Sequence, residues 1–132
     1  MERITVSSGT EWEARVGYSR AVRTGSHVHV SGTTATDADG DIVARGDPYE
    51  QTRRALANVR SALEEADASL ADVVRTRMFV ADIDQWDEIG AAHAEYFGEV
   101  RPATSMVEVS RLIDTELLVE IEATAIVTEE AE

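Results

Sequence analysis

Cysteine and lysine are both absent from this 132-residue chain, which also has no long apolar run. Without cysteine, disulfides, thiolate nucleophiles and cysteine-ligated metals are excluded. No segment approaches the ~20 apolar residues that a membrane span requires. The N-terminal MERITVSSGT lacks the apolar core of a signal peptide. These absences predict a cytoplasmic protein without a membrane partner.

Negative charge dominates the composition. There are 26 acidic residues and 12 basic ones, all of them arginine, which gives a net charge of −14. Such a protein repels itself unless salt screens the charge, so the composition favours a halophilic-type protein from a salt-rich cytoplasm. A GC-rich genome is the alternative, and it explains the missing lysine better than the acidic excess. The shortage of cations argues against nucleic acid as a partner.

The length predicts a single domain over residues 1–132. Residues 1–14 are expected to form an N-terminal strand and loop, and residues 128–132 a frayed acidic tail. Within this domain, ERITV (2–6) is expected to be a strand and SSGTEWEARVG (7–17) a loop. Residues 19–32 are expected to form two strands joined at Thr24–Ser26. TDADGD (36–41) is typical of a turn.

Two amphipathic helices are expected. Asp47 is a candidate N-cap, followed by Pro48 and by Glu50 at capping-box spacing. This helix is expected to end near Asp67, and its apolar residues recur on one stripe: Leu56, Val59, Leu63 and Ala66. Asp84 is a candidate cap for the second helix, which Gly98 ends. The stripe of the second helix is Trp86, Ile89, His93 and Phe97.

The remaining strands are expected at 73–82, 103–109 and 117–127. The last of these has an apolar row that should face the helices: Val119, Ile121, Ala123, Ala125 and Val127. Its opposite row is mixed: Leu118, Glu120, Glu122, Thr124 and Ile126. We assign Thr104, Met106 and Glu108 of the preceding strand to that same mixed face. Two helices cover one face of a sheet, so the mixed face is a candidate oligomer interface with clefts.

Several stretches together resemble the RidA/YjgF family, also called the reactive-intermediate deaminase family. They cover nearly all of residues 15–127: GYSRAV (17–22), VHVSGTTA (28–35), the long segment 50–80, RPATSMVEV (101–109) and VEIEATAIV (119–127). The resemblance implies an α+β, chorismate-mutase-like fold, with a single mixed sheet that carries two helices on one face. It also implies a homotrimer with a central β-barrel and three inter-subunit clefts.

Members of that family with deaminase activity hydrolyse enamines and imines such as 2-aminoacrylate, without a cofactor, to a keto acid and ammonia. The resemblance carries the catalytic Glu onto Glu120. It carries substrate-binding positions onto Tyr18, Ser31 and Gly32, and the substrate-binding Arg of the family's PAR[ST] motif onto Thr104. Met106, on the face assigned to Thr104, is counted as a further substrate-binding residue.

Thr104 is the main departure from the family pattern. A threonine side chain cannot form the two charge-assisted hydrogen bonds with which an arginine binds a carboxylate. Either the cleft is adapted to a neutral or different ligand, or Thr104 only fills a vacated place. A compensating arginine is a third possibility, with Arg20, Arg101 and Arg111 as candidates. A second departure is Gly90, which stands where many members carry an asparagine.

The other polar residues are weighed in the same way. Glu120 is expected to act in the cleft, whereas Glu122 is expected to pair with an arginine across the interface. His27 and His29 share a strand face but lack a third ligand, so no metal site is predicted. His93, on the apolar stripe, is expected to be a partly buried structural residue.

Three functions stay open at this point. The first is an enzyme that deaminates a small imine, enamine or related metabolite. The second is a ligand-binding or regulatory trimer without turnover. The third and weakest is the endoribonuclease activity known in some relatives, against which the acidity and the missing lysine argue.

Overall fold

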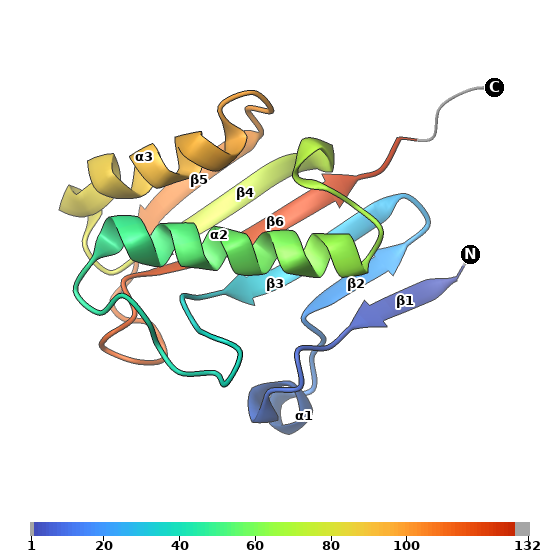
Figure 1. Ribbon diagram of the computed structural model, residues 1–132, viewed down its shortest axis with the longest axis horizontal. Coiled ribbons are helices and arrows are strands. Elements are labelled where there is room, and N and C mark those ends of the chain that lie inside the picture. Colours follow the sequence, from blue (N-terminus) through green and yellow to red (C-terminus); the bar gives the residue numbers. More distant parts are fainter. Residues whose placement is uncertain (1, 129–132) are drawn as a thin grey trace.

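The computed structural model describes residues 2–128, which form one six-stranded sheet with helices packed on it (Figure 1). The strands are β1 (Arg3–Val6), β2 (Ala21–Thr24), β3 (His27–Thr33), β4 (Val73–Val80), β5 (Ala103–Glu108) and β6 (Val119–Ile126). The helices are α1 (Glu11–Val16), α2 (Pro48–Glu65) and α3 (Trp86–Phe97), with short 3-10 turns η1 (Leu70–Asp72) and η2 (Ile83–Gln85). Except for Thr128, the predicted acidic tail lies outside the described residues.

The sheet has the strand order β1-β2-β3-β6-β4-β5. Strands β4 and β5 are parallel and are joined through α3, whereas every other neighbouring pair is antiparallel. The prediction of a single mixed sheet is therefore confirmed. The C-terminal strand β6 lies between β3 and β4, so it ties the N-terminal hairpin to the β4–α3–β5 unit.

Helix α2 begins as its sequence predicts. The Asp47 side chain accepts a hydrogen bond of 3.0 Å from the Glu50 backbone N–H, and Pro48 is the first helical residue. Its apolar stripe is buried, with Leu56 and Val59 fully inaccessible to solvent. Burial of each such side chain contributes about 1.5–3 kcal/mol. Figure 1 shows α2 and α3 on the same face of the sheet, which confirms the predicted layer.

The start of α3 differs from the prediction. Asp82 caps the preceding turn η2 by accepting from the Asp84 backbone N–H at 2.9 Å, so the prediction that Asp84 caps this segment is wrong. An Asp that precedes a tight turn is the better acceptor, because its side chain reaches forward two residues. On the stripe, Ile89 and Phe97 are buried, whereas Trp86 remains 59% exposed. Gly98 ends α3 in a right-handed conformation.

The N-terminal segment 7–17, predicted as a loop, contains the short helix α1. Its buried Glu13 carboxylate accepts hydrogen bonds from Ser7 Oγ at 2.9 Å and from Thr10 Oγ1 at 3.2 Å. Gly17 ends the helix with a left-handed φ of 91°. A helix this short is marginal by propensity. Its stability depends on these contacts, which composition does not reveal.

The two faces of β6 have the predicted character. Val119, Ile121, Ala123 and Ala125 are buried beneath the helices, whereas Glu120, Glu122 and Thr124 on the opposite face are only partly buried. We call that opposite side, away from α2 and α3, the open face. None of the helices in residues 2–128 combines the length and apolarity needed to cross a bilayer.

Candidate functional site

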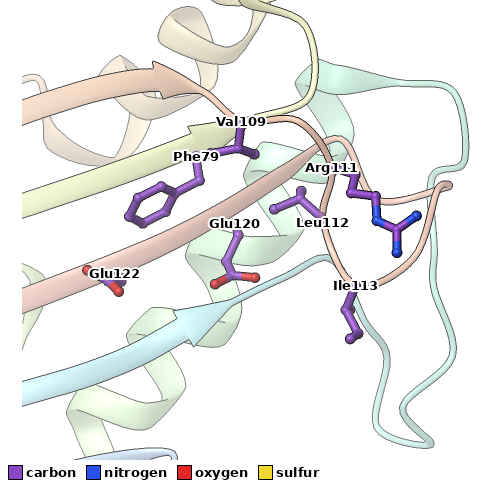
Figure 2. Close-up of a pocket in the computed structure, with 7 residues that line it drawn as sticks. All are labelled: Phe79, Val109, Arg111, Leu112, Ile113, Glu120 and Glu122. Atoms are coloured by element: carbon purple, nitrogen blue, oxygen red, sulfur yellow. The ribbon is translucent and has the colours of Figure 1, made fainter.

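Glu120 lies on the open face of β6, directly opposite Phe79 of β4 (Figure 2). Its carboxylate rests against the backbone of Gly32, near the end of β3. A β-carbon added to Gly32 would lie 2.1 Å from Glu120 Oε2, far inside van der Waals contact. Because glycine has no β-carbon, Gly32 permits this close approach of the Glu120 carboxylate.

Three groups determine the basicity of Glu120. Burial raises the pKa of its carboxyl group, the negative charge of Glu122 raises it further, and the positive charge of Arg20 opposes both. The net result is a pKa above the ordinary value. Such a carboxylate is a stronger proton acceptor than an exposed one, which is a property required of a general base.

Arg20 connects Glu120 to the other predicted residues. Its Nη2 donates to the Gly32 carbonyl at 2.5 Å, and its guanidinium carbon lies 5.8 Å from the centre of the Tyr18 ring. The Ser31 hydroxyl donates to the Ser19 carbonyl at 2.6 Å. The structure thus brings Tyr18, Ser31, Gly32 and Glu120 to one end of the β2–β3 hairpin.

A depression of about 480 Å³ opens beside Glu120 on the open face. It is lined by Phe79, Val109, Arg111, Leu112, Ile113, Glu120 and Glu122. Arg111 lies on the loop after β5, and Figure 2 shows its guanidinium directed away from the Glu120 carboxylate. The pocket therefore offers two carboxylates and an apolar wall to a small ligand.

Glu122 has its ion-pair partner within the same chain. Its carboxylate lies 3.6 Å from Arg77 Nη1, and both side chains are substantially exposed. We predicted a partner across an interface, and the structure places the arginine on the neighbouring strand β4 instead. An exposed pair of this kind contributes at most about 1 kcal/mol.

Thr104, Met106 and Glu108 do not lie on the open face, so our assignment of them to the Glu120 face is wrong. The parallel register aligns Thr104 with Thr76 and Met106 with Met78. Thr76 and Met78 are buried on the helix side of β4. Residues that face each other across a strand pair share a side of the sheet. Within one chain, the sheet therefore separates Thr104 from Glu120.

Thr104 belongs to a chain of hydrogen bonds that sequence reasoning missed. Its Oγ1 lies 2.7 Å from Thr76 Oγ1, which in turn lies 2.9 Å from His93 Nε2 on α3. His93 is partly buried, as predicted, and burial lowers the pKa of its imidazole. The sequence contained a signal for this contact, because Thr76 and His93 each interrupt an apolar row. Polar side chains that become buried need hydrogen-bond partners, and two such residues on facing elements can supply them to each other.

Within one chain, none of the three candidate compensating arginines hydrogen-bonds to the Thr104 hydroxyl among residues 2–128. Arg20 binds Gly32, and Arg111 lines the depression on the open face. Arg101 occupies a left-handed turn, with φ of 54°, ahead of β5. The hydrogen-bond partners of Thr104 Oγ1 among residues 2–128 are Thr76 and the Pro102 carbonyl, both uncharged.

Comparison with known proteins places this geometry in context. The family described as Endoribonuclease L-PSP matches residues 8–127. The chain is 41% identical to an uncharacterised protein of Streptomyces coelicolor, over 91% of this chain and 89% of that protein. It is 36% identical to the protein named 3-aminoacrylate deaminase RutC of Acinetobacter baylyi, over 82% of this chain and 85% of that one.

A solved structure is also similar over nearly the whole chain. The crystal structure of a Mycobacterium tuberculosis member of the YjgF/YER057c/UK114 family superposes with a TM-score of 0.88. The two sequences are 54% identical, and the match covers 96% of this chain and 100% of the other.

Proposed function

This chain belongs to the Endoribonuclease L-PSP family, the RidA/YjgF proteins, and on that premise we propose that it deaminates a small imine, enamine or related metabolite. The observation that carries the proposal is the partly buried Glu120, held against Gly32 with a raised pKa. A 36% identical relative named 3-aminoacrylate deaminase supports this class of reaction.

The reaction needs one well-placed base. Glu120 takes a proton from water while the water oxygen bonds to the imine carbon, and the C=N electrons pass to nitrogen. The nitrogen receives that proton from Glu120 and a second proton from the new hydroxyl group, and it leaves as ammonia while the hydroxyl oxygen forms the carbonyl. An enamine first gains a proton at carbon and loses one from nitrogen to become the imine. Tyr18, Ser31 and Gly32 bind the substrate beside Glu120, and no cofactor is required.

Thr104 and Met106, which we also propose as substrate-binding residues, must come from a second copy. In one chain they lie on the opposite side of the sheet from Glu120. A ligand of a few heavy atoms cannot reach around the sheet to contact both sets. We therefore propose inter-subunit clefts in a homotrimer, whose central barrel forms from the open faces.

Exposed apolar side chains on the open face support that assembly. Val107 is 46% exposed and Ile126 is 37% exposed, although both lie on strands of the sheet. Exposed apolar groups on a sheet face are compatible with burial against another copy. The proposed trimer has a small metabolite as its other partner, no nucleic acid and no membrane, and it functions in the cytoplasm.

A ligand-binding or regulatory trimer without turnover is the second candidate, favoured by the uncharged Thr104. Such a protein would bind its ligand and release it unchanged. Endoribonuclease activity is a weaker third candidate, since 26 acidic residues against 12 basic ones disfavour binding to a nucleic acid backbone.

Turnover of freshly generated 2-aminoacrylate and its neutral amide, 2-aminoacrylamide, by wild type and Glu120→Gln tests the proposal. Loss of the base should reduce turnover by about 10²- to 10⁴-fold. Glu99→Gln is the matched control, because Glu99 is exposed and lies just after α3. The assay is run at low salt and in molar KCl, which screens the charge of −14. Unchanged turnover in Glu120→Gln, or none in wild type, would contradict the proposal.

A further inference from the structure

An uncharged chain of hydrogen bonds runs from α3 to the exposed edge of the sheet. It begins at His93 Nε2, passes through the buried Thr76 hydroxyl at 2.9 Å, and reaches the Thr104 hydroxyl at 2.7 Å. Thr104 Oγ1 also lies 3.1 Å from the Pro102 carbonyl oxygen. Thr104 is exposed on β5, which is an edge strand. The chain thus connects a partly buried imidazole to the molecular surface.

The direction of these hydrogen bonds follows from counting protons. The Pro102 carbonyl can only accept, so the single hydroxyl proton of Thr104 is directed to it. Thr104 Oγ1 then accepts the proton of Thr76, and Thr76 Oγ1 accepts from His93 Nε2–H. Three protons satisfy all three contacts in this order. In the reverse order, the Pro102 contact has no proton.

This order determines what Thr104 presents at the surface. Its own proton is committed to Pro102, so the remaining lone pair of its oxygen is what a ligand meets. A ligand N–H or O–H can donate to that lone pair. A carboxylate cannot, because both groups are acceptors and no cation of the same chain lies among the hydrogen-bond partners of Thr104 in residues 2–128.

The surface of α3 is open on the same side as His93. Gly90 precedes His93 by three residues, so both lie on one face of the helix. A β-carbon at Gly90 would have no non-local heavy atom within 4 Å. At low ionic strength the net charge of −14 also disfavours anionic ligands, because it repels anions and leaves neutral ligands unaffected.

We propose that the His93–Thr76–Thr104 chain forms a subsite for the neutral hydrogen-bond donor of a ligand, such as a carboxamide, in place of a carboxylate. This inference rests on the proposed function, because it names the substrate class of the same cleft. The substrate is then a neutral imine or enamine, and its hydrolysis yields an uncharged keto compound and ammonia.

Calorimetric binding of pyruvamide and pyruvate tests the subsite directly. The two probes share a skeleton and differ in having an amide or a carboxylate. Wild type should bind pyruvamide more tightly than pyruvate. Thr104→Val should weaken pyruvamide binding by roughly 3- to 10-fold, the value of one neutral hydrogen bond. Thr104→Ser, which keeps the hydroxyl, should preserve it.

Thr5→Val is the matched control, because Thr5 is an exposed threonine on β1, the other edge strand. It should leave the binding of both probes unchanged. Tighter binding of pyruvate, failure of pyruvamide to bind, or the same pyruvamide affinity in Thr104→Val as in wild type would overturn the subsite. Turnover in the Glu120→Gln experiment is a separate measurement. A wild type that turns over 2-aminoacrylate but prefers pyruvate therefore loses only this inference.

The direction of the hydrogen bonds along the His93–Thr76–Thr104 chain can be measured separately. Nitrogen-15 NMR of the His93 ring should show the proton on Nε2, and Thr76→Val should change that resonance. A neutral His93 with its proton on Nδ1 would reverse the chain and contradict the acceptor role of Thr104.

Discussion

The two ends of the candidate site carry different chemistry. At the Glu120 end, on the open face, charges of both signs gather, with Arg20 and Glu122 acting on one carboxylate. At the Thr104 end, on the helix side, uncharged groups form a directed chain that begins at His93. The first end suits proton transfer and the second suits recognition of a neutral group. Within one chain the sheet keeps them apart, and the proposed trimer would bring them together across a subunit boundary.

Gly32→Ala should displace the Glu120 carboxylate without affecting the Thr104 end of the site. We expect it to have the largest effect on turnover. The new β-carbon would lie 2.1 Å from Glu120 Oε2, so the carboxylate must move. Displacing a catalytic group by about 1 Å costs on the order of 100-fold in rate. The clash is with the end of a flexible side chain, so thermal unfolding should change little. Full turnover in this variant would contradict the position assigned to Glu120.

The pH dependence of turnover tests whether the charges of Arg20 and Glu122 act on the Glu120 carboxylate. Glu120 acts as a base only when ionised, so activity should rise with pH through its raised pKa. Glu122→Gln removes a like charge and should move the profile to lower pH. Arg20→Gln removes the opposing charge and should move the profile to higher pH. Profiles that coincide with wild type would show that neither residue acts on the base.

The same carboxylate affects stability in a defined direction. Because the folded-state pKa of Glu120 is raised above 4.5, the stability gained from its protonated form is present below that pH. It is lost as pH rises through the folded-state value. Urea unfolding of wild type and Glu120→Gln should therefore show the variant gaining relative stability between acid and neutral pH.

Gly90→Ala tests the Thr104 end and should have the smallest effect. The residue lies within α3, and a β-carbon there meets no neighbour within 4 Å. Replacing a helical glycine with alanine should stabilise the fold by about 0.5–1 kcal/mol. A lower melting temperature would show that the space beside His93 is already filled.

The sequence predicted those features that depend on local signals. Asp47 and Pro48 identified the start of α2, and the alternation from Val119 onward identified which face of β6 packs on the helices. The grouping of Tyr18 with Glu120 came from the family resemblance, and the contacts through Arg20 are compatible with it.

Features that depend on contacts between residues distant in the sequence, or on individual side-chain hydrogen bonds, were not predicted. The face of Thr104 depends on how β5 aligns with β4, and the residues of β5 alternate too weakly to reveal it. A shift of one residue reverses the face of every side chain on a strand. Helix α1 depends on hydrogen bonds to Glu13, which a loop-like composition conceals.

The most direct test of the composite site mixes two inactive variants. Glu120→Gln removes the base, and Thr104→Trp fills the neutral subsite; each alone should be inactive. In a mixed trimer, a subunit with native Glu120 meets one with native Thr104. Random equal mixing should therefore restore about a quarter of wild-type turnover, because each cleft draws on two subunits. Activity that stays at the level of the separate variants would contradict a site shared between copies.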